Sequence, residues 1–391
     1  MTTATKAHGL DGALVEPDWP PLILNELEHL LEHFPAAGAP VAILSTSPRP
    51  FSAASVVETL RGQVFIKRHA RALRDAEGLR EEHRFMQHLL ANGIGVPRVF
   101  ETQSGDTAVE TGEWTYEVHE IPVGVDLYED AISWTPFTSA EHARSAGEML
   151  ARMHVAAERY EAPSRGIRPL VASFTIFASQ NPGEALEQYL RARPVLDQDA
   201  PTRRDCHDAL DLLTPFHEEL KRLLPSLPSL WTHNDLHASN LFWSRSGPRA
   251  GCTSVIDFGL ADRANAVYDI AQAIERNIVE WLALMRDPDA GDRVAVHLDH
   301  LWALLEGYEG VRPLSPAEVS ALAPMLALGH AEFALTEAHY FLGVLHSPEK
   351  ARVATRDYLV KHAQWFRGPG RKLLEPLRRR AEARTKRAVR A

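Results

Sequence analysis

The spacing of apolar residues changes several times along the first 120 positions. Residues 20–34 (PPLILNELEHLLEHF) carry apolar side chains at helical spacing, which predicts an amphipathic helix that ends before the loop PAAGAP. Residues 41–47, 52–60 and 63–69 have the period and composition of short strands. The last two are joined by a tight turn at Arg61 and Gly62. This part of the chain is therefore predicted to be rich in strands.

One helix interrupts these strands. Residues 75–94 are amphipathic, with Asp75 near the start and Asn92-Gly93 at the end, as helix boundaries require. Two further strands follow at 106–111 and 113–121. Five strands with a helix inserted after the third predict a small mixed lobe.

From about residue 122 onward the pattern is mostly helical, apart from the polar segment near 233–240 and an apolar strand-like run at 253–259 (TSVIDFG). We therefore expect an α+β, two-lobed fold. The division is an extension with the amphipathic helix (1–37), a strand-rich N-lobe (38–121) and a larger helical C-lobe (122–391).

Composition narrows the class of protein. The two cysteines, Cys206 and Cys252, lie too far apart in the sequence for a disulfide framework or a paired-cysteine zinc site. The start of the chain lacks the features of a secretory signal, and we see no apolar run long enough to span a bilayer, so a cytoplasmic location without membrane contact is expected.

The formal net charge is −10 although residues 371–391 are strongly basic. We interpret that tail as a solvated helix, expect no nucleic-acid partner, and note that the acidic body permits a cationic substrate.

The segment WTHNDLHASNLFW crowds His233, Asp235, His237 and Asn240 into eight residues. Three interpretations compete. In an extended segment the two histidines and the aspartate would share one face, as a metal triad requires, but Asn240 is then unexplained. The histidines are alternatively satisfied polar groups in a buried turn.

The third interpretation is phosphoryl transfer. Asp235 is followed five positions later by Asn240, and then by Asp257 in VIDFG. This chemistry needs a carboxylate to orient the attacking hydroxyl and oxygen ligands for Mg²⁺ beside the phosphates. The three residues supply these groups in one hairpin-like unit.

The N-lobe should then supply a cation. Lys67 lies on the third strand, in VFIK, where a kinase holds the α- and β-phosphates. On the following helix Glu82 falls in the middle of the apolar stripe, whereas Glu81 points away from it. An inward carboxylate needs a partner, so we expect Glu82 to pair with Lys67.

These residues carry a resemblance. The chain resembles the aminoglycoside phosphotransferase / choline kinase-like family, small-molecule kinases related to the protein kinases. The matching parts are VFIK, EEHRFMQHLL with VPRVF, YEVHEIPVG, AGEMLARMH, HNDLHASNLFW and VIDFGLADR with YDIAQAI. They cover about three fifths of the chain, and the two aspartate motifs are the most specific.

The resemblance implies a protein-kinase-like fold, ATP and Mg²⁺ as cofactors, and a role for each matching residue. Asp235 would be the catalytic base, and Asn240 and Asp257 the magnesium ligands. Lys67 would hold the phosphates with Glu82 orienting it. His119, Glu120 and Ile121 would meet adenine through backbone groups. Asp269, which opens a helix and can cap it, would brace the catalytic loop.

The chain also departs from the pattern of protein kinases. No G-x-G-x-x-G precedes Lys67, and in the corresponding turn, residues 46–55, Ser47, Ser52 and Ser55 are the candidate phosphate donors. Asn234 replaces the arginine before the catalytic aspartate, and no A-P-E follows. A small-molecule hydroxyl acceptor is therefore expected. A non-catalytic nucleotide-binding scaffold and, with less support, a protein kinase remain as alternatives.

Contacts to the acceptor should come from the C-lobe. The candidates follow Asp269 or share one face of a later helix: Glu275, Asn277, Glu332, Thr336 and His339. An acidic pocket lined by helices suits an amine-bearing alcohol such as an aminoglycoside, choline, homoserine or an amino sugar. The sequence does not rank these, and it leaves the choice of ATP or GTP and the oligomeric state open.

Overall fold

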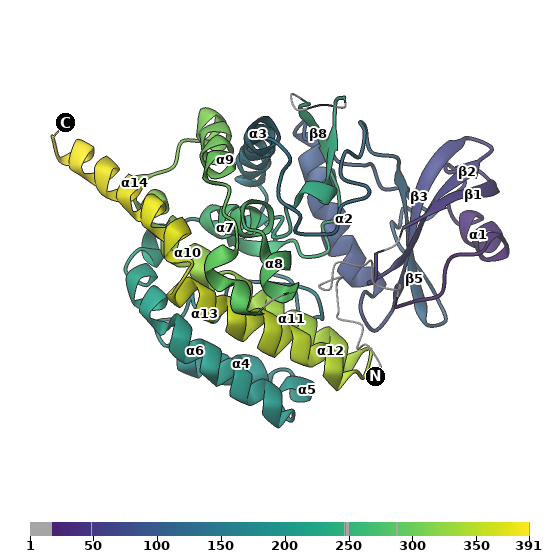
Figure 1. Ribbon diagram of the computed structural model, residues 1–391. Helices are drawn as coiled ribbons and strands as arrows, with labels where there is room; N and C mark the ends of the chain where they lie inside the picture. The colour runs from purple at the N-terminus through teal and green to yellow at the C-terminus, as the bar shows by residue number, and fades with distance from the viewer. Residues whose placement is uncertain (1–17, 48, 246, 248–249, 287, 391) are drawn as a thin grey trace.

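The computed structural model describes residues 18–390 apart from 48, 246, 248, 249 and 287, and the side chains of 285–289 and 387–390 are likewise outside the description. The first 17 residues of the predicted extension therefore lie outside the described residues. Two groups of elements lie side by side in Figure 1, a sheet with few helices and a larger helical body. The predicted boundary between the lobes near residue 122 stays a prediction.

The N-lobe is built on an antiparallel sheet in the order β1-β2-β3-β5-β4. The strands match the sequence prediction, although β4 is shorter than expected. The helix α2 (Ala76–Ala91) follows β3 and is capped by Asp75, whose side chain accepts from the Gly78 N–H. The bounds are β1 Pro40–Thr46, β2 Ala53–Thr59, β3 Gly62–Ala70, β4 Val109–Thr111 and β5 Trp114–Glu120.

The period of two along β3 and β5 separates an outer face from an inner face. On the outer face Ile66 and Val118 pack with Leu27 of α1 (Leu24–Leu31) in one apolar cluster. Figure 1 shows α1 on the side of the sheet away from the helical body. Lys67 and Glu117, which are partners in the β3–β5 register, alternate with these residues and so belong to the inner face. The sheet thus presents its polar inner residues toward α2 and the C-lobe.

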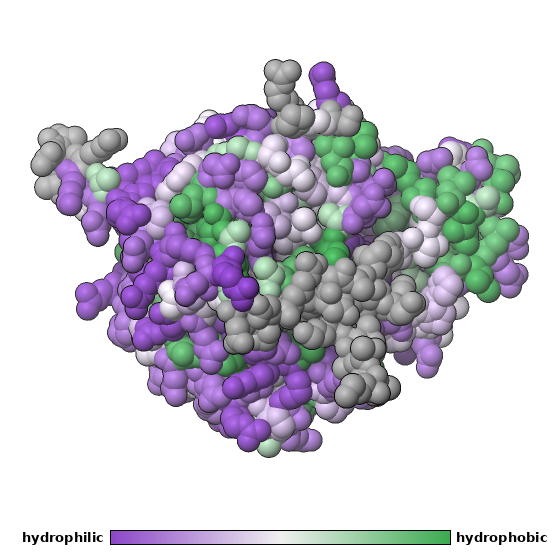
Figure 2. All heavy atoms as spheres, in the orientation of Figure 1, coloured by the Kyte–Doolittle hydropathy of each residue, from purple (hydrophilic) through white to green (hydrophobic). Residues whose placement is uncertain are grey.

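The outer end of the N-lobe is apolar on its surface. Leu60, Val41, Leu44 and Ile23 are all exposed, with Leu60 retaining 78% of its accessible area. Figure 2 shows apolar residues gathered at this end of the molecule. β1 is the edge strand of the sheet, and the described part of the chain leaves its outer edge without a paired strand.

The connection from β5 into the C-lobe lies against the segment around Trp243. Val125 and Trp243 exchange two backbone hydrogen bonds of 2.8 and 2.9 Å. Gly124 has a φ of 125°, and a Cβ there would lie 2.8 Å from the Trp243 carbonyl oxygen. Only glycine fits this conformation and this close approach, so Gly124 allows the linker to pack directly against the backbone of Trp243.

The C-lobe is helical apart from two short two-stranded sheets, β6–β9 and β7–β8. Its elements are α3 Ala140–Ala157, α4 Pro182–Arg191, α5 Pro194–Asp197, α6 Ala200–Leu220, η2 Leu224–Ser226, β6 Ser229–Thr232, η3 Ala238–Asn240, β7 Leu241–Trp243, β8 Cys252–Val255, β9 Asp262–Asn265, α7 Ala266–Ile278, α8 Trp281–Arg286, η4 Pro288–Arg293, α9 Leu298–Val311, α10 Pro316–Leu328, α11 His330–Gly343, α12 Pro348–Arg352, η5 Val353–Val360, α13 Lys361–Arg367 and α14 Arg371–Arg390.

One continuous stretch of the C-lobe, Pro316–Gly343 across α10 and α11, is long and apolar enough to cross a membrane, contrary to the expectation that no such run exists. Its mean hydropathy is 1.3, but 94% of the most apolar window is buried inside the protein. We therefore assign α10 and α11 to the C-lobe core.

The basic tail forms the predicted helix, α14, which projects from the helical body in Figure 1. Its first half is packed rather than solvated, because Leu373, Leu374 and Leu377 are buried. Arg380 and Arg384 both pair with Glu309 of α9. Part of the positive charge of the tail is thus neutralised within the protein.

Candidate active site

A buried carboxylate sets the shape of the segment between β6 and β7, which carries Asp235. The two oxygens of Asp269 accept from the backbone N–H groups of His233, at 2.9 Å, and Asn234, at 2.8 Å. His154 of α3 lies 3.0 Å from the same carboxylate. Asn234 has a positive φ of 65°, which asparagine tolerates better than most residues. The loop therefore turns sharply just before Asp235.

Asp269 braces the loop, as the resemblance implied, but it does not cap its own helix. The N-cap of α7 is Asn265, whose side chain accepts from the Tyr268 N–H at 3.0 Å. The expectation that Asp269 caps the helix was wrong, because the N-cap of α7 lies four positions earlier, at Asn265.

Asn277 is a second brace. Its side-chain oxygen accepts from the Ala238 N–H at 2.8 Å, and its amide donates to the Leu236 carbonyl at 2.8 Å. The side chain is fully buried. The prediction that Asn277 contacts the acceptor is corrected, since both ends of its amide are used to hold the loop.

Asp235 is held by Arg276 of α7, whose Nη1 contacts Asp235 Oδ1 and also donates to the Asn234 carbonyl at 2.8 Å. Asn240 donates to the Asp235 backbone carbonyl at 2.9 Å, and its amide nitrogen lies 3.5 Å from Oδ2. Burial raises the pKa of the Asp235 carboxyl to about 7 against the opposing charge of Arg276. Asp235 therefore titrates in the neutral range.

Asp257 lies beyond the strand on which it was predicted. β8 ends at Val255, and Asp257 has a positive φ of 63°. Its Oδ1 is 3.4 Å from Lys67 Nζ, an ion pair that joins the two lobes. Burial opposes ionisation of Asp257, but the charge of Lys67 prevails and lowers its pKa to about 2. The carboxylate is thus negative at every physiological pH.

These groups meet in one cavity between the lobes. The predicted residues Lys67, Glu82, Ser52, Asp235, Asn240 and Asp257 all contribute to its wall. His237 also lines it, whereas His233 is buried behind the loop with Nε2 bonded to the Ile256 carbonyl at 3.0 Å. The two histidines and Asp235 therefore do not form the metal triad considered from the sequence.

The predicted pair of Lys67 and Glu82 is not formed. Glu82 Oε1 lies 2.9 Å from Arg74 Nε and 2.9 Å from Arg165 Nη2. Both arginines also donate to the Gly259 carbonyl, at 2.7 and 3.1 Å. Sequence reasoning placed Glu82 on the inward face correctly but missed the arginines that compete for it. Its carboxylate links α2 to the segment after Asp257.

Some backbone groups of the residues predicted to contact adenine already form hydrogen bonds within the protein. His119 and Glu120 pair with Phe65 and Val64 of β3. On the other side the Glu120 N–H donates to the Arg98 carbonyl at 2.8 Å. Pairing of adenine with His119 or with the Glu120 N–H is therefore disfavoured, and the contact at Ile121 stays a prediction.

The remaining acceptor candidates also point elsewhere. Glu275 is buried, with Oε1 accepting from the Tyr358 hydroxyl at 3.2 Å. Glu332 accepts from the Ile176 N–H at 2.6 Å and so holds the segment before α4. Among the described residues that form the cavity wall, none of Glu275, Asn277, Glu332, Thr336 and His339 is present.

The rest of the C-lobe wall of the cavity is made by residues that sequence reasoning missed. Phe333 and Glu337 are one turn apart on α11, one position away from the predicted face at 332 and 336. Trp134 joins them from the loop before α3 with a positive φ of 70°. Arg49, from the turn between β1 and β2, enters from the N-lobe and donates to Ser133 Oγ at 2.8 Å. The spacing of four between Phe333 and Glu337 is the sequence pattern that could have indicated a shared face of α11. No sequence pattern indicated Trp134 or Arg49.

Comparison with known proteins agrees with this geometry. Residues 51–314 match the phosphotransferase enzyme family (APH). A homoserine kinase of Caulobacter vibrioides is 29% identical over 355 residues, covering 90% of each chain. A homoserine kinase of Methylobacterium radiotolerans is 28% identical over 274 residues, covering 70% of this chain and 71% of that protein.

Solved structures share the fold at low identity. A microcompartment-associated aminopropanol kinase aligns with a TM-score of 0.59 at 17% identity, over 91% of this chain and 99% of that one. The amicoumacin kinase hAmiN aligns with a TM-score of 0.54 at 14% identity, over 86% and 92%. The predicted kinase-like, two-lobed fold and the predicted class of small-molecule phosphotransferase are confirmed. The chain belongs to the phosphotransferase enzyme family.

Proposed function

We propose that the protein transfers the γ-phosphate of ATP to the hydroxyl of a small amine-bearing alcohol, with Mg²⁺ bound beside the phosphates. The observation that carries this proposal is the convergence of Asp235, Asp257 and Lys67 on one cavity between the lobes. Homoserine is the first acceptor to test, because the curated relatives are named homoserine kinases.

Asp235 is the residue that orients the acceptor hydroxyl and takes its proton. A base works best when its pKa lies near the working pH, and that of Asp235 is about 7. Arg276 holds Oδ1, which leaves Oδ2 to face the hydroxyl. Asn240 and Arg276 together fix the carboxylate in one orientation, so little reorganisation is required when the acceptor binds.

The residues present fit a magnesium ion. Asp257 supplies an ionised carboxylate in the cavity wall, and its side chain retains 46% of its accessible area. Asn240 uses its amide nitrogen on Asp235, which leaves its carbonyl oxygen as a second hard ligand. Bound Mg²⁺ neutralises charge on the phosphates. Asp257 and Asn240 would hold it.

The phosphates need cations from the N-lobe. Lys67 Nζ already lies in the cavity beside Asp257. The turn before β2 lacks glycines, and Arg49 and Ser52 project from it into the same cavity. We assign Lys67 to the α- and β-phosphates and Arg49 with Ser52 to the terminal phosphate, in place of a glycine-rich loop.

The acceptor amine belongs at the C-lobe wall. Glu337 offers a carboxylate there, and the rings of Trp134 and Phe333 lie beside it with centroids 5.9 Å apart. Because the Phe333 ring already packs against the guanidinium of Arg276, whose Cζ lies 4.6 Å from the ring centroid, we assign the ammonium group to the Glu337 carboxylate. A short amino alcohol bound here would place its hydroxyl toward Asp235 in the same cavity.

The first experiment measures ATP turnover with a panel of acceptors: homoserine, 1-amino-2-propanol, ethanolamine, choline and an aminoglycoside. We expect transfer to at least one of them, and a loss of about 10²- to 10⁴-fold in kcat for Asp235→Asn. Asp208→Asn, at an exposed ion pair with Arg356, is the matched control. Equal turnover by the wild type and Asp235→Asn would overturn the assignment. Stabilisation by ATP without transfer to any acceptor would favour the scaffold.

The second experiment tests the amine contact. Glu337→Gln should raise KM for 1-amino-2-propanol and leave KM for propane-1,2-diol, which lacks the amine, nearly unchanged. His339→Gln, on the same helix but away from the cavity wall, is the control. If Glu337→Gln affects the amine and the diol equally, Glu337 does not bind the ammonium group.

A further inference from the structure

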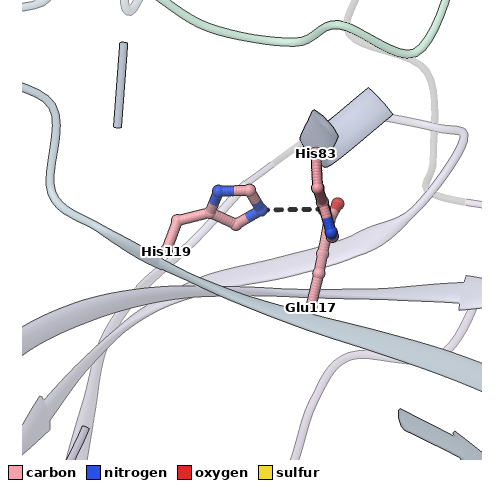
Figure 3. Close-up of side chains that lie close together, drawn as sticks. All are labelled: His83, Glu117 and His119. Carbon is pink, nitrogen blue, oxygen red and sulfur yellow. Dashed lines mark hydrogen bonds and ion pairs between the residues drawn. The ribbon is translucent and has the colours of Figure 1, made fainter. Parts of the chain in front are cut away.

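Four titratable side chains converge inside the N-lobe, and one of them, His69, also lines the cavity that contains Asp235. His69 comes from β3, His83 from α2, and Glu117 and His119 from β5. All four are buried, with exposed fractions between 1% and 8%. Figure 3 shows the rings of His83 and His119 directed at the carboxylate of Glu117. The proposed phosphoryl transfer does not use these histidines.

The contacts within the cluster are short. Glu117 Oε2 lies 2.7 Å from His83 Nε2 and 2.8 Å from His119 Nε2. The other oxygen, Oε1, lies 2.9 Å from His69 Nε2. One ligand atom from each of His83, Glu117 and His119 falls within 4.8 Å of the others. The same nitrogen, Nε2, is thus offered by every ring.

This arrangement is close to that of a transition-metal site. Atoms bound to one zinc ion at about 2.0–2.1 Å in tetrahedral geometry lie roughly 3.3 Å apart. The contacts of 2.7 and 2.8 Å need to open by only about half an ångström to admit an ion, again by this geometry. The two rings cross at 79°, so they approach the carboxylate from different directions.

The environment of His83 adds a second observation. Its Nδ1 lies 2.8 Å from Thr107 Oγ1, and both side chains are buried. A histidine that binds a metal through one nitrogen usually donates its other N–H to an oxygen, which fixes the ring. Thr107 is placed for that role. The orientation of His83 is therefore set independently of Glu117.

We propose that His83, Glu117 and His119 bind one divalent transition-metal ion of the Zn²⁺ class. His69 contacts the other oxygen of Glu117 and so orients this carboxylate. Imidazole nitrogen suits zinc, whereas the oxygens of Asn240 and Asp257 suit magnesium, so the two sites select different ions. The ion would join α2 to β5 and so brace the helix that carries Glu82. It would also bind the carboxylate that faces Lys67 in the β3–β5 register.

The test uses the full chain stripped of metal by a chelator and returned to buffer with saturating Mg²⁺. Zn²⁺ is added, and bound metal is measured by equilibrium dialysis and elemental analysis. We expect one Zn²⁺ per chain and a melting temperature that rises with Zn²⁺. The double variant His83→Gln with His119→Gln should lose this ion, although each glutamine keeps an amide that can donate to Glu117. Thr107→Val should weaken binding about 10- to 100-fold.

Two controls locate the ion. His29→Gln alters an exposed histidine on α1 and should bind Zn²⁺ as the wild type does. Asp257→Asn disrupts the magnesium ligands and should leave this ion in place. Melting in the presence of chelator shows whether each variant folds. Cobalt substitution of the wild type gives a reading that needs no variant, because tetrahedral Co²⁺ absorbs far more strongly than octahedral Co²⁺.

The proposal fails on any of three results. The first is a wild-type chain that binds no Zn²⁺ under saturating Mg²⁺. The second is a folded double variant that binds Zn²⁺ with unchanged affinity. The third is an ion that disappears with Asp257→Asn, or a Co²⁺ spectrum of the octahedral type. In each case the cluster is a metal-free network in which Glu117 accepts hydrogen bonds from three imidazole rings.

Discussion

Arg276 and Asp235 form an ion pair at the base of the cavity, in which a fully buried guanidinium contacts one oxygen of the carboxylate. Arg276 lies on α7, seven positions after Asp269, so two residues on one face of this helix act on the same loop. Asp269 holds the backbone of the loop, and Arg276 holds its carboxylate. α7 is therefore the element that orients the loop carrying Asp235.

The pH dependence of activity follows from this pair. Asp235 has to be ionised to accept a proton, and its pKa is raised to about 7, so kcat/KM should increase as the pH rises through about 7. Arg276 lowers that pKa, so Arg276→Met should move the acidic limb to higher pH while Arg276→Lys keeps it near the wild-type position. A limb that does not move in Arg276→Met would show that another group titrates.

Glu82 and Lys67 should give opposite phenotypes. Glu82→Gln removes the negative partner of Arg74 and Arg165, and breaking such a buried pair lowers the free energy of unfolding by about 3 kcal/mol. Lys67→Met should instead reduce turnover strongly with a small change in stability. Urea unfolding and ATP kinetics on both variants decide this. A Glu82→Gln protein that has normal stability but binds ATP poorly would instead support the original prediction that Glu82 pairs with Lys67.

Asp269→Asn should destabilise the protein and slow the reaction together. Two backbone N–H groups and His154 share this carboxylate, and an amide cannot accept from all of them. We expect a loss of about 2 kcal/mol or more in the free energy of unfolding. The exposed substitution Asp208→Asn should cost less than about 1 kcal/mol. Similar losses in the two variants would contradict a bracing role.

Asn277→Ala should act on every acceptor alike. It leaves the Ala238 N–H and the Leu236 carbonyl without their partner, which lowers the free energy of unfolding by about 2 kcal/mol. The distorted loop then reduces kcat by a similar factor for all acceptors in the panel. A rise in KM confined to one acceptor would mean that Asn277 contacts substrate after all.

The crossing of α3 and α9 offers a test of packing within one helix. A Cβ on Gly307 would lie 2.9 Å from the Arg144 carbonyl carbon, whereas a Cβ on Gly310 meets nothing within 4 Å. Gly307→Ala should therefore lower the free energy of unfolding by about 1–3 kcal/mol. Gly310→Ala should be neutral or stabilise by up to about 1 kcal/mol. The comparison requires only thermal or urea unfolding, and equal effects would refute the close packing.

Local pattern was enough to predict much of this protein. Alternation and helical spacing placed the five N-lobe strands, α2 and the inward face of Glu82, because the backbone period alone decides which side chains share a face. The motifs around Asp235 and Asp257 could be recognised without the fold, since the chemistry they predict depends on residue types at short spacing. Those residues lie in one cavity wall with Lys67.

Only the tertiary structure decided which side chains pair with one another. Glu82 had a lysine nearby on the expected strand, but Arg165 arrives from a segment more than eighty residues away and takes its carboxylate. The face of α11 that lines the cavity lies one position from the predicted face, because the rotation of a buried helix depends on all of its neighbours. His83 and Glu117 meet for the same reason, although they lie 34 positions apart in the sequence. Sequence spacing specifies faces, whereas the packing of whole elements specifies which faces meet.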